Sequence, residues 1–178
     1  MMGGIHQDLY RPLERPDCAA IARHYNRNLG CADPLWCASG APWDARRVWL
    51  HRTLLALRGR GTAIAVVHVV DGRVHSYFGG YERGGRATYS IGVVDLGLPE
   101  PMDTWRRDSA HAFDGSLGRG VDEFRVTASS DRARYVGWME REVGMRRLEG
   151  QTIWVACGAT MRAYVAGQLG GAELARVS

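Results

Sequence analysis

Residues 62–94 read TAIAVVHVVDGRVHSYFGGYERGGRATYSIGVV and contain three apolar, strand-forming runs separated by two turns. Asp71-Gly72 lies between the first two runs and is typical of two-residue β-hairpin turns, whose central positions need a positive φ. A looser turn with two glycines, at residues 82–86, precedes the third run. The stretch therefore predicts three consecutive antiparallel strands at the centre of a sheet.

The residues before this stretch predict one short strand and two helices. A strand is expected at residues 9–10, and apolar residues recur at helical spacing over residues 18–29. A second helix is expected over residues 42–59, with Pro42 in its first turn. The apolar side of this second helix would consist of Trp43, Leu50, Leu54 and Leu57.

The residues after the third strand alternate between helices and strands. The pattern predicts a helix over 102–117, a strand over 123–129, a helix over 130–144, and strands over 145–150 and 152–158. This order indicates an α/β protein with a single mixed, mostly antiparallel sheet flanked by helices. We expect one domain over residues 1–160 and a C-terminal tail over 161–178, whose glycines weaken its helical character.

Two stretches of the chain carry a resemblance to a known superfamily. LYRPLERPDCAAI (9–21) looks like an opening strand that leads into a first helix, and FRVTASSDRARYVGWMEREVGM (124–145) looks like a late strand and helix that end on Gly144-Met145. Together with the order of elements, they resemble the GNAT (GCN5-related N-acetyltransferase) superfamily over nearly the whole chain. The resemblance implies an acyl-CoA N-acyltransferase-like fold, in which acetyl-CoA lies beside the fourth strand.

The turn DLGLPEP (95–101) departs from that superfamily's pattern. Members carry a basic, glycine-rich run there, whose backbone N–H groups bind the diphosphate of acyl-CoA at a helix N-terminus. In this chain Asp95 and Glu100 bring negative charge, and Pro99 and Pro101 have no N–H to donate. Only Gly97 matches the pattern. Three glycine-arginine clusters are alternative phosphate sites, although turns and helix ends already require their glycines: Gly59-Arg60-Gly61, Gly84-Gly85-Arg86 and Gly118-Arg119-Gly120.

The position of the catalytic acid departs from the pattern as well. Many members carry a tyrosine four residues before the glycine of the late helix, where it protonates the leaving thiolate. Here that position is Glu140, and Tyr135 lies five residues earlier, on another side of an α-helix. Glu140 and Tyr135 are the candidate acids, and a surface glutamate is the simpler interpretation of Glu140.

Two functions are compatible with these residues. The first is a non-catalytic or catalytically eroded GNAT-fold protein, a binding or structural module with no cofactor. It would be similar to acetyltransferase-like proteins that short-tailed phages encode for the virion or its assembly. The second is an active N-acyltransferase that transfers an acetyl group from acetyl-CoA to an amine. Its cofactor contacts would be Ile91, Val93, Val94, Gly97, Ser129 and Ser130.

The charged residues indicate which kinds of partner the protein could bind. All 23 cationic residues are arginine and the net charge is +4, so nucleic acid is a candidate partner besides other proteins. Arg46, Arg47, Arg52, Arg58 and Arg60 crowd one segment, for which a solvated helix face is the alternative.

The sequence also gives expectations about metal ions, membrane spans and cellular location. Cys18, Cys31, Cys37 and Cys157 match no zinc motif, so we expect no metal. No apolar run reaches the roughly 18 residues of a membrane span, and the first residues lack a signal-peptide pattern. We expect a protein of the cytoplasm, or of the host cytoplasm or virion if a phage encodes it.

Overall fold

The fold is built on one sheet of seven strands in the order β1-β2-β3-β4-β5-β7-β6. A computed structural model describes residues 8–29, 41–128 and 133–175. Among the described strands only β4 and β5 pair in parallel, so the predicted mixed, mostly antiparallel sheet is confirmed. The strands are β1 (Asp8–Pro12), β2 (Ala63–Val70), β3 (Arg73–Arg83), β4 (Arg86–Val94), β5 (Glu123–Thr127), β6 (Arg146–Arg147) and β7 (Ile153–Cys157).

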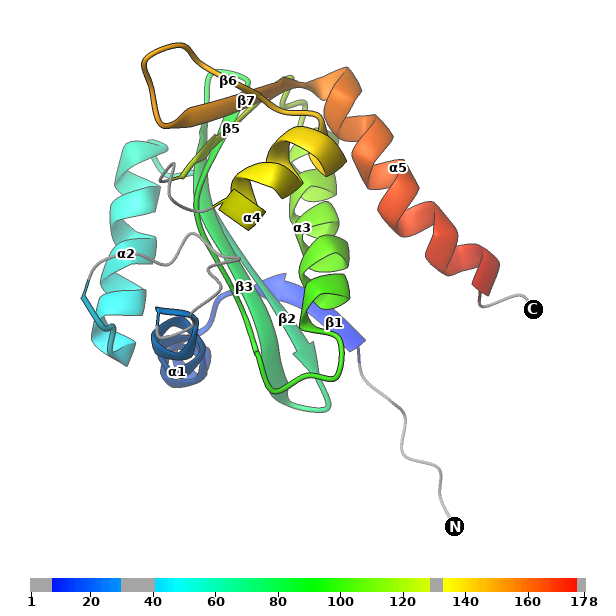
Figure 1. Cartoon of the computed structure of the whole chain (residues 1–178). Helices are drawn as coiled ribbons and strands as arrows, with labels where there is room; N and C mark the ends of the chain where they lie inside the picture. Colours follow the sequence, from blue (N-terminus) through cyan, green and yellow to red (C-terminus); the bar gives the residue numbers. More distant parts are fainter. Residues whose placement is uncertain (1–7, 30–40, 129–132, 176–178) are drawn as a thin grey trace.

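Helices cover both faces of the sheet. One face carries α1 and α2, and the other carries α3 and α4, with α5 packed outside α3 (Figure 1). None of the described helices is long and apolar enough to cross a membrane. The helices are η1 (Arg15–Asp17), α1 (Cys18–Leu29), α2 (Ala45–Arg58), α3 (Pro101–Gly118), α4 (Ala133–Gly137), the π-helical η2 (Trp138–Val143) and α5 (Gly158–Ala175).

The three central strands form as their pattern predicts. β2 and β3 pair antiparallel from Ala63 opposite Tyr81 to Val70 opposite Arg73, and β4 returns along β3. Asp71 and Gly72 both have a positive φ, 49° and 76°, which the tight hairpin requires. Alternate residues of these strands face opposite sides, so the sheet contributes to two separate hydrophobic cores.

The buried side of α2 differs from the predicted one. Leu50, Leu54 and Leu57 are 56%, 47% and 69% exposed, whereas Val48 and Leu55 are fully buried against the sheet. The helix begins at Ala45 because Asp44 caps it by accepting from the N–H of Arg47 at 2.7 Å. Pro42 therefore precedes the helix. The three leucines form an apolar stripe on the outer side, which we call the α2 leucine stripe.

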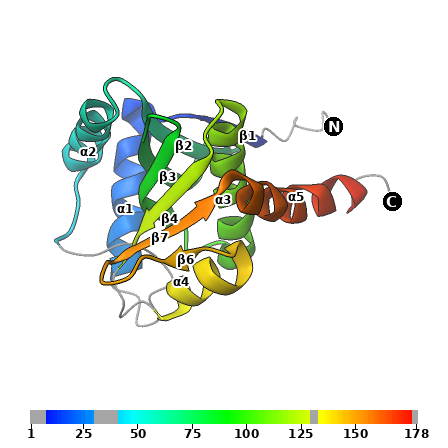
Figure 2. The same ribbon diagram turned by 90° about the horizontal axis from the view of Figure 1, so that it is seen from above.

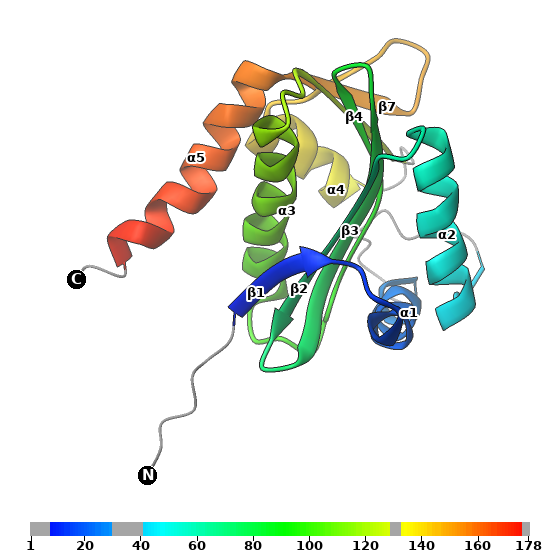
Figure 3. The same ribbon diagram turned by 180° about the vertical axis from the view of Figure 1, so that it is seen from behind.

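The C-terminal part of the chain packs on the domain. α5 begins at Gly158, and Met161, Tyr164 and Val165 belong to the core under α3. The helix then continues away from the sheet (Figure 3). The first turns of the predicted tail are thus part of the same core as the preceding 160 residues.

Candidate functional site

The sheet opens between β4 and β5. The two strands pair in parallel only over residues 86–89 and 123–126, and β4 then continues along β3 to Val94. Ser90 is an extra residue at the point of separation, because Tyr89 pairs with Gly80 and Ile91 with Gly79. We call this opening the β4–β5 fork. It is where the resemblance implies that the acyl-CoA thioester would lie.

Three aromatic side chains fill the fork from the side of α3. Trp105 of α3, Tyr135 of α4 and Trp138 of η2 are each at most 4% exposed. Their ring centroids lie 5.4–6.0 Å apart. The cavity left between these rings and the strands measures about 10 Å³. That is space for roughly one water molecule, whereas pockets for small ligands usually measure about 300–1,000 Å³.

In the turn between β4 and α3, a side-chain carboxylate of the turn accepts a backbone hydrogen bond, as a bound anion would. The N–H of Gly97 donates to Asp95 Oδ1 at 2.9 Å, and the N–H of Leu98 donates to the Asp95 carbonyl at 3.2 Å. The Asp95 side chain is buried, with His24 Nδ1 at 3.6 Å and an Arg27 nitrogen at 3.8 Å. Two amides of this turn, those of Gly97 and Leu98, are thus already engaged.

An ion pair joins α3 and η2, the helices that carry Trp105 and Trp138. Arg106 of α3 forms two hydrogen bonds to Glu142 of η2, at 2.6 and 3.0 Å, in the bidentate geometry that guanidinium and carboxylate favour. The hydrogen bonds from Arg106 hold the pKa of Glu142 below its usual value. This ion pair keeps α3 and η2 together over the aromatic rings.

The predicted acids lie apart from each other. The Glu140 carboxylate is exposed and accepts from the Trp154 indole at 2.9 Å, which ties η2 to β7. Tyr135 is buried among the rings of the fork. Counting residues back from Gly144 assumed an α-helix, but residues 138–143 are π-helical, and their wider turn changes which side chains share a face.

The predicted cofactor residues are partly placed. Ile91 and Val93 point into the core under α1, Val94 into the core under α3, and Gly97 lies in the turn closed by Asp95. The Val94 carbonyl also accepts from Asn28 of α1 at 3.0 Å. Ser129 and Ser130, like Cys31 and Cys37, lie outside the described residues.

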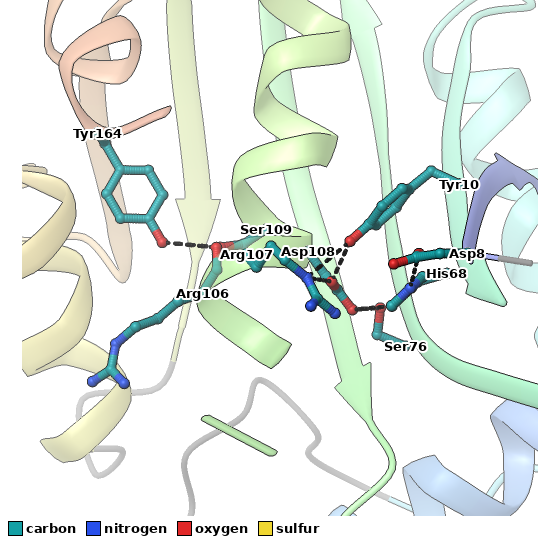
Figure 4. A network of polar contacts seen from close by, with 9 residues as sticks. All are labelled: Asp8, Tyr10, His68, Ser76, Arg106, Arg107, Asp108, Ser109 and Tyr164. Atoms are coloured by element: carbon teal, nitrogen blue, oxygen red, sulfur yellow. Dashed lines mark hydrogen bonds and ion pairs between the residues drawn. The ribbon is translucent and has the colours of Figure 1, made fainter. Parts of the chain in front are cut away.

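A second polar cluster, which the sequence did not reveal, is centred on Asp108 of α3. Asp108 Oδ2 lies 2.8 Å from His68 Nδ1 and accepts from the Ser76 hydroxyl at 2.6 Å, while Oδ1 accepts from Tyr10 at 2.7 Å (Figure 4). His68 Nε2 lies 2.7 Å from Asp8. Strands β1, β2 and β3 are thereby fastened to α3. We call these five residues the Asp108 network.

The Asp108 network has the residue types of a catalytic triad but not its connections. A triad needs the nucleophile bonded to the histidine, whereas Ser76 and His68 both bond to Asp108. Ser76, His68 and Asp108 are also each 1% exposed. Burial alone would raise the pKa of Asp108, but the hydrogen bonds from His68, Ser76 and Tyr10 outweigh it and lower that pKa. The network is suited to hold the fold rather than to react with a substrate.

Two histidines, His75 and His111, lie beside this network. Burial lowers the pKa of His75 and of His111. The ring of His75 meets that of His68 edge-on at 5.3 Å, and Tyr10 stacks between His68 and His111. Among the described residues, no group of three or more His, Cys, Asp and Glu side chains could hold a metal ion.

Known structures share this architecture. No protein-family model and no curated protein matches the sequence. Ard1 from Thermoplasma volcanium has a TM-score of 0.61 at 10% identity, over 84% of this chain and 97% of that one. Mycobacterium smegmatis RimJ in complex with CoA-disulfide has a TM-score of 0.59 at 16% identity, over 94% of each chain.

A third such structure is a GNAT family acetyltransferase from Brucella melitensis in complex with acetyl-CoA. Its TM-score is 0.57 at 12% identity, over 86% of this chain and 90% of that one. The predicted fold is thereby confirmed: the chain has the fold of the GNAT acetyltransferases. At these identities the likeness extends to the fold alone.

Proposed function

We propose that this chain is a GNAT-fold protein that does not transfer acyl groups and acts as a binding or structural module without a cofactor. The observation that carries the proposal is the filled β4–β5 fork. Trp105, Tyr135 and Trp138 occupy the space beside β4 in which the arm of an acyl-CoA would have to lie, and they leave about 10 Å³.

The β4–α3 turn supports the same proposal. An anion site at a helix N-terminus works through free amides and an absence of competing negative charge. Here Asp95 accepts from Gly97, and Glu100 and Asp103 add carboxylates at the start of α3. The residues present therefore do not fit the diphosphate of acetyl-CoA.

The partner of such a module is a further part of the proposal. The α2 leucine stripe (Leu50, Leu54 and Leu57) is an exposed apolar surface of the kind that protein partners cover. A phage origin and a role in the virion or its assembly, in the host cytoplasm, stay predictions. Neighbouring genes for portal, capsid or tail proteins would support them, and neighbours from ordinary metabolism would contradict them.

Isothermal titration with acetyl-CoA and with CoA tests the absence of a cofactor. We expect no heat of binding up to millimolar ligand and no release of CoA in the presence of simple amines. Binding with a micromolar Kd would overturn the proposal. A GNAT acetyltransferase of known affinity serves as the positive control.

One observation favours the alternative, an active N-acyltransferase. The fork keeps its bulge, and Ser90 at that bulge has a buried hydroxyl without a hydrogen-bond partner among the described residues. A ligand at the fork could satisfy such a hydroxyl. This function requires the three rings to move out of the fork. Acetyl-CoA would then quench the tryptophan fluorescence of the wild type but much less that of Trp105→Phe.

A further inference from the structure

The sheet face that carries α1 and α2 is only partly covered. These two helices contact β2, β3 and β4, while β5, β7 and β6 extend beyond them (Figure 2). On β4 and β5, Ala87, Tyr89, Phe124 and Val126 face the core under α3. The residues that alternate with them, Arg86, Thr88 and Arg125, therefore face the opposite, open side.

A groove runs over this open side where β3, β4 and β5 meet the end of α2. It has a volume of about 670 Å³. Its principal lining residues are Arg58, Tyr81, Arg83, Arg86, Thr88 and Arg125, and we call it the arginine groove. Four of these six side chains are cationic, and they come from four different elements of the fold.

The carboxylates nearby neutralise only part of this charge. Glu123 pairs with Arg86 at 2.8 Å and also contacts Arg125, so one acid serves two arginines. In the part of the chain that the structure describes, Arg58 and Arg83 form no ion pair, and both side chains are exposed. Glu82 lies between them in sequence but points to the other face, where it binds Arg119 at 2.6 Å.

The positive surface continues past Arg125. A second hollow of about 520 Å³ has Arg125 in its lining and extends over β7 to Arg146. Asp122 and Glu123 are the acids of this hollow. The two hollows together present five arginines against two carboxylates in one row. A row of charge fits an extended polyanion better than a single small anion.

We propose that the arginine groove binds single-stranded nucleic acid along its phosphate backbone. Guanidinium groups form bidentate bonds with phosphate, and three arginines of the groove lie on neighbouring strands, since Arg83 is opposite Arg86 and Arg125 is opposite Thr88. Tyr81 supplies a partly buried aromatic ring that lines the groove among them, and an unstacked base can pack on its accessible part. A duplex keeps its bases stacked, so it gains nothing from Tyr81.

The arginine groove deepens the proposed binding role and does not depend on the filled fork. It lies on the sheet face opposite to Trp105, Tyr135 and Trp138, so a ligand in the groove leaves these rings in place. A protein that binds acetyl-CoA and nucleic acid would contradict only the proposed function. A protein that binds neither would contradict only this inference.

Fluorescence anisotropy with a labelled 20-nucleotide oligo(dT) tests the inference on the full chain. We expect a micromolar Kd at low salt, with a slope of log K against log [NaCl] of about −2, as about three net phosphate contacts imply for a single strand. Arg58→Gln/Arg83→Gln should weaken binding at least tenfold and make the slope shallower by about 1.4. Tyr81→Leu should weaken binding several-fold and leave the slope unchanged.

The controls separate the groove from the overall charge. Arg73→Gln/Arg162→Gln removes the same charge from exposed positions outside the groove and should change the Kd less than about twofold. Equal loss in both double variants would overturn the proposal. So would tighter binding of duplex DNA than of oligo(dT), or competition by inorganic polyphosphate as effective, per charge, as that by unlabelled oligo(dT). Circular dichroism of each variant confirms that it is folded.

Discussion

The indole ring of Trp105 lies directly against the backbone of Gly92 in β4. A Cβ atom built on Gly92 would come within 2.3 Å of Trp105 Cη2, closer than real contacts allow. Gly92 is therefore needed for the ring to enter the β4–β5 fork. A larger residue would have to push Trp105 out or bend the strand.

Gly92→Ala should lower the free energy of unfolding by about 2 kcal/mol, because overpacking forces the surrounding side chains out of their preferred rotamers. Urea denaturation measures the change. The double variant Gly92→Ala/Trp105→Leu should lose less stability than the sum of the losses in the two single variants, since the smaller side chain at position 105 relieves the clash. Gly167→Ala is the control, because its Cβ would meet no atom within 4 Å, and it should stabilise α5 by about 0.5–1 kcal/mol. Simple additivity at positions 92 and 105 would contradict the contact.

Asp95→Ala should cost about 1 kcal/mol of stability, because the N–H of Gly97 loses an acceptor, the Asp95 carboxylate, whose side chain is buried. Asp114→Ala removes an exposed carboxylate of α3 and should stay within about 0.5 kcal/mol of the wild type. Inorganic diphosphate should raise the Tm of Asp95→Ala and leave that of the wild type unchanged. If diphosphate stabilised both proteins equally, the Asp95 carboxylate would not occupy the anion position.

Asp108→Asn should be the most destabilising of these substitutions, by about 3 kcal/mol, because the amide nitrogen of Asn would face buried groups that now bond to a carboxylate oxygen. Asp103→Asn, on the exposed side of the same helix, should change stability by less than about 0.5 kcal/mol. The pKa of Asp108 is lowered in the folded protein, so its stabilisation is complete above the unfolded value of about 3.9 and is lost as the pH falls below it. The difference between wild type and Asp108→Asn should therefore shrink below about pH 4. A difference that stays constant to pH 3 would contradict this assignment.

The stability of the protein should also fall between pH 6.5 and 4 because of His51. Burial, helped by Arg58 and Arg47, lowers the pKa of His51 to about 4. Above about pH 6.5 the ring is neutral in both states; between the two pKa values the unfolded chain binds a proton that the folded chain does not. Unfolding at a series of pH values should therefore show a shallower decline for His51→Gln than for the wild type. Parallel curves would mean that another group causes the decline.

The sheet was predictable because its signal is local. Alternation along residues 62–94 and the Asp71-Gly72 turn fix strand pairing within a few residues, and the observed register agrees with them. The helix faces were less predictable. Leu50, Leu54 and Leu57 have the spacing of a buried stripe, but burial depends on which side of α2 meets the sheet, and Val48 and Leu55 lie there. Hydrophobicity alone did not distinguish the two sides.

The site depends on contacts between residues far apart in sequence. Trp105 and Trp138 meet in the fork although 33 residues separate them, and His68 reaches Asp108 across 40 residues. Neither pair has a characteristic spacing. The sequence showed that acids and prolines replace the phosphate-binding pattern in the turn at 95–101. The hydrogen bond from Gly97 to Asp95 could be recognised only in the structure.

The Asp95 turn also has a consequence for the protein's behaviour in a cell. A protein that binds a ligand in its folded state gains stability in proportion to the logarithm of the ligand's concentration, so its abundance can follow metabolism. Here the acceptor in the turn is the carboxylate of Asp95, which belongs to the chain itself. Its effective concentration is therefore fixed. Under the proposed function, the lifetime of the folded protein would not depend on the concentration of acyl-CoA in the cell that makes it.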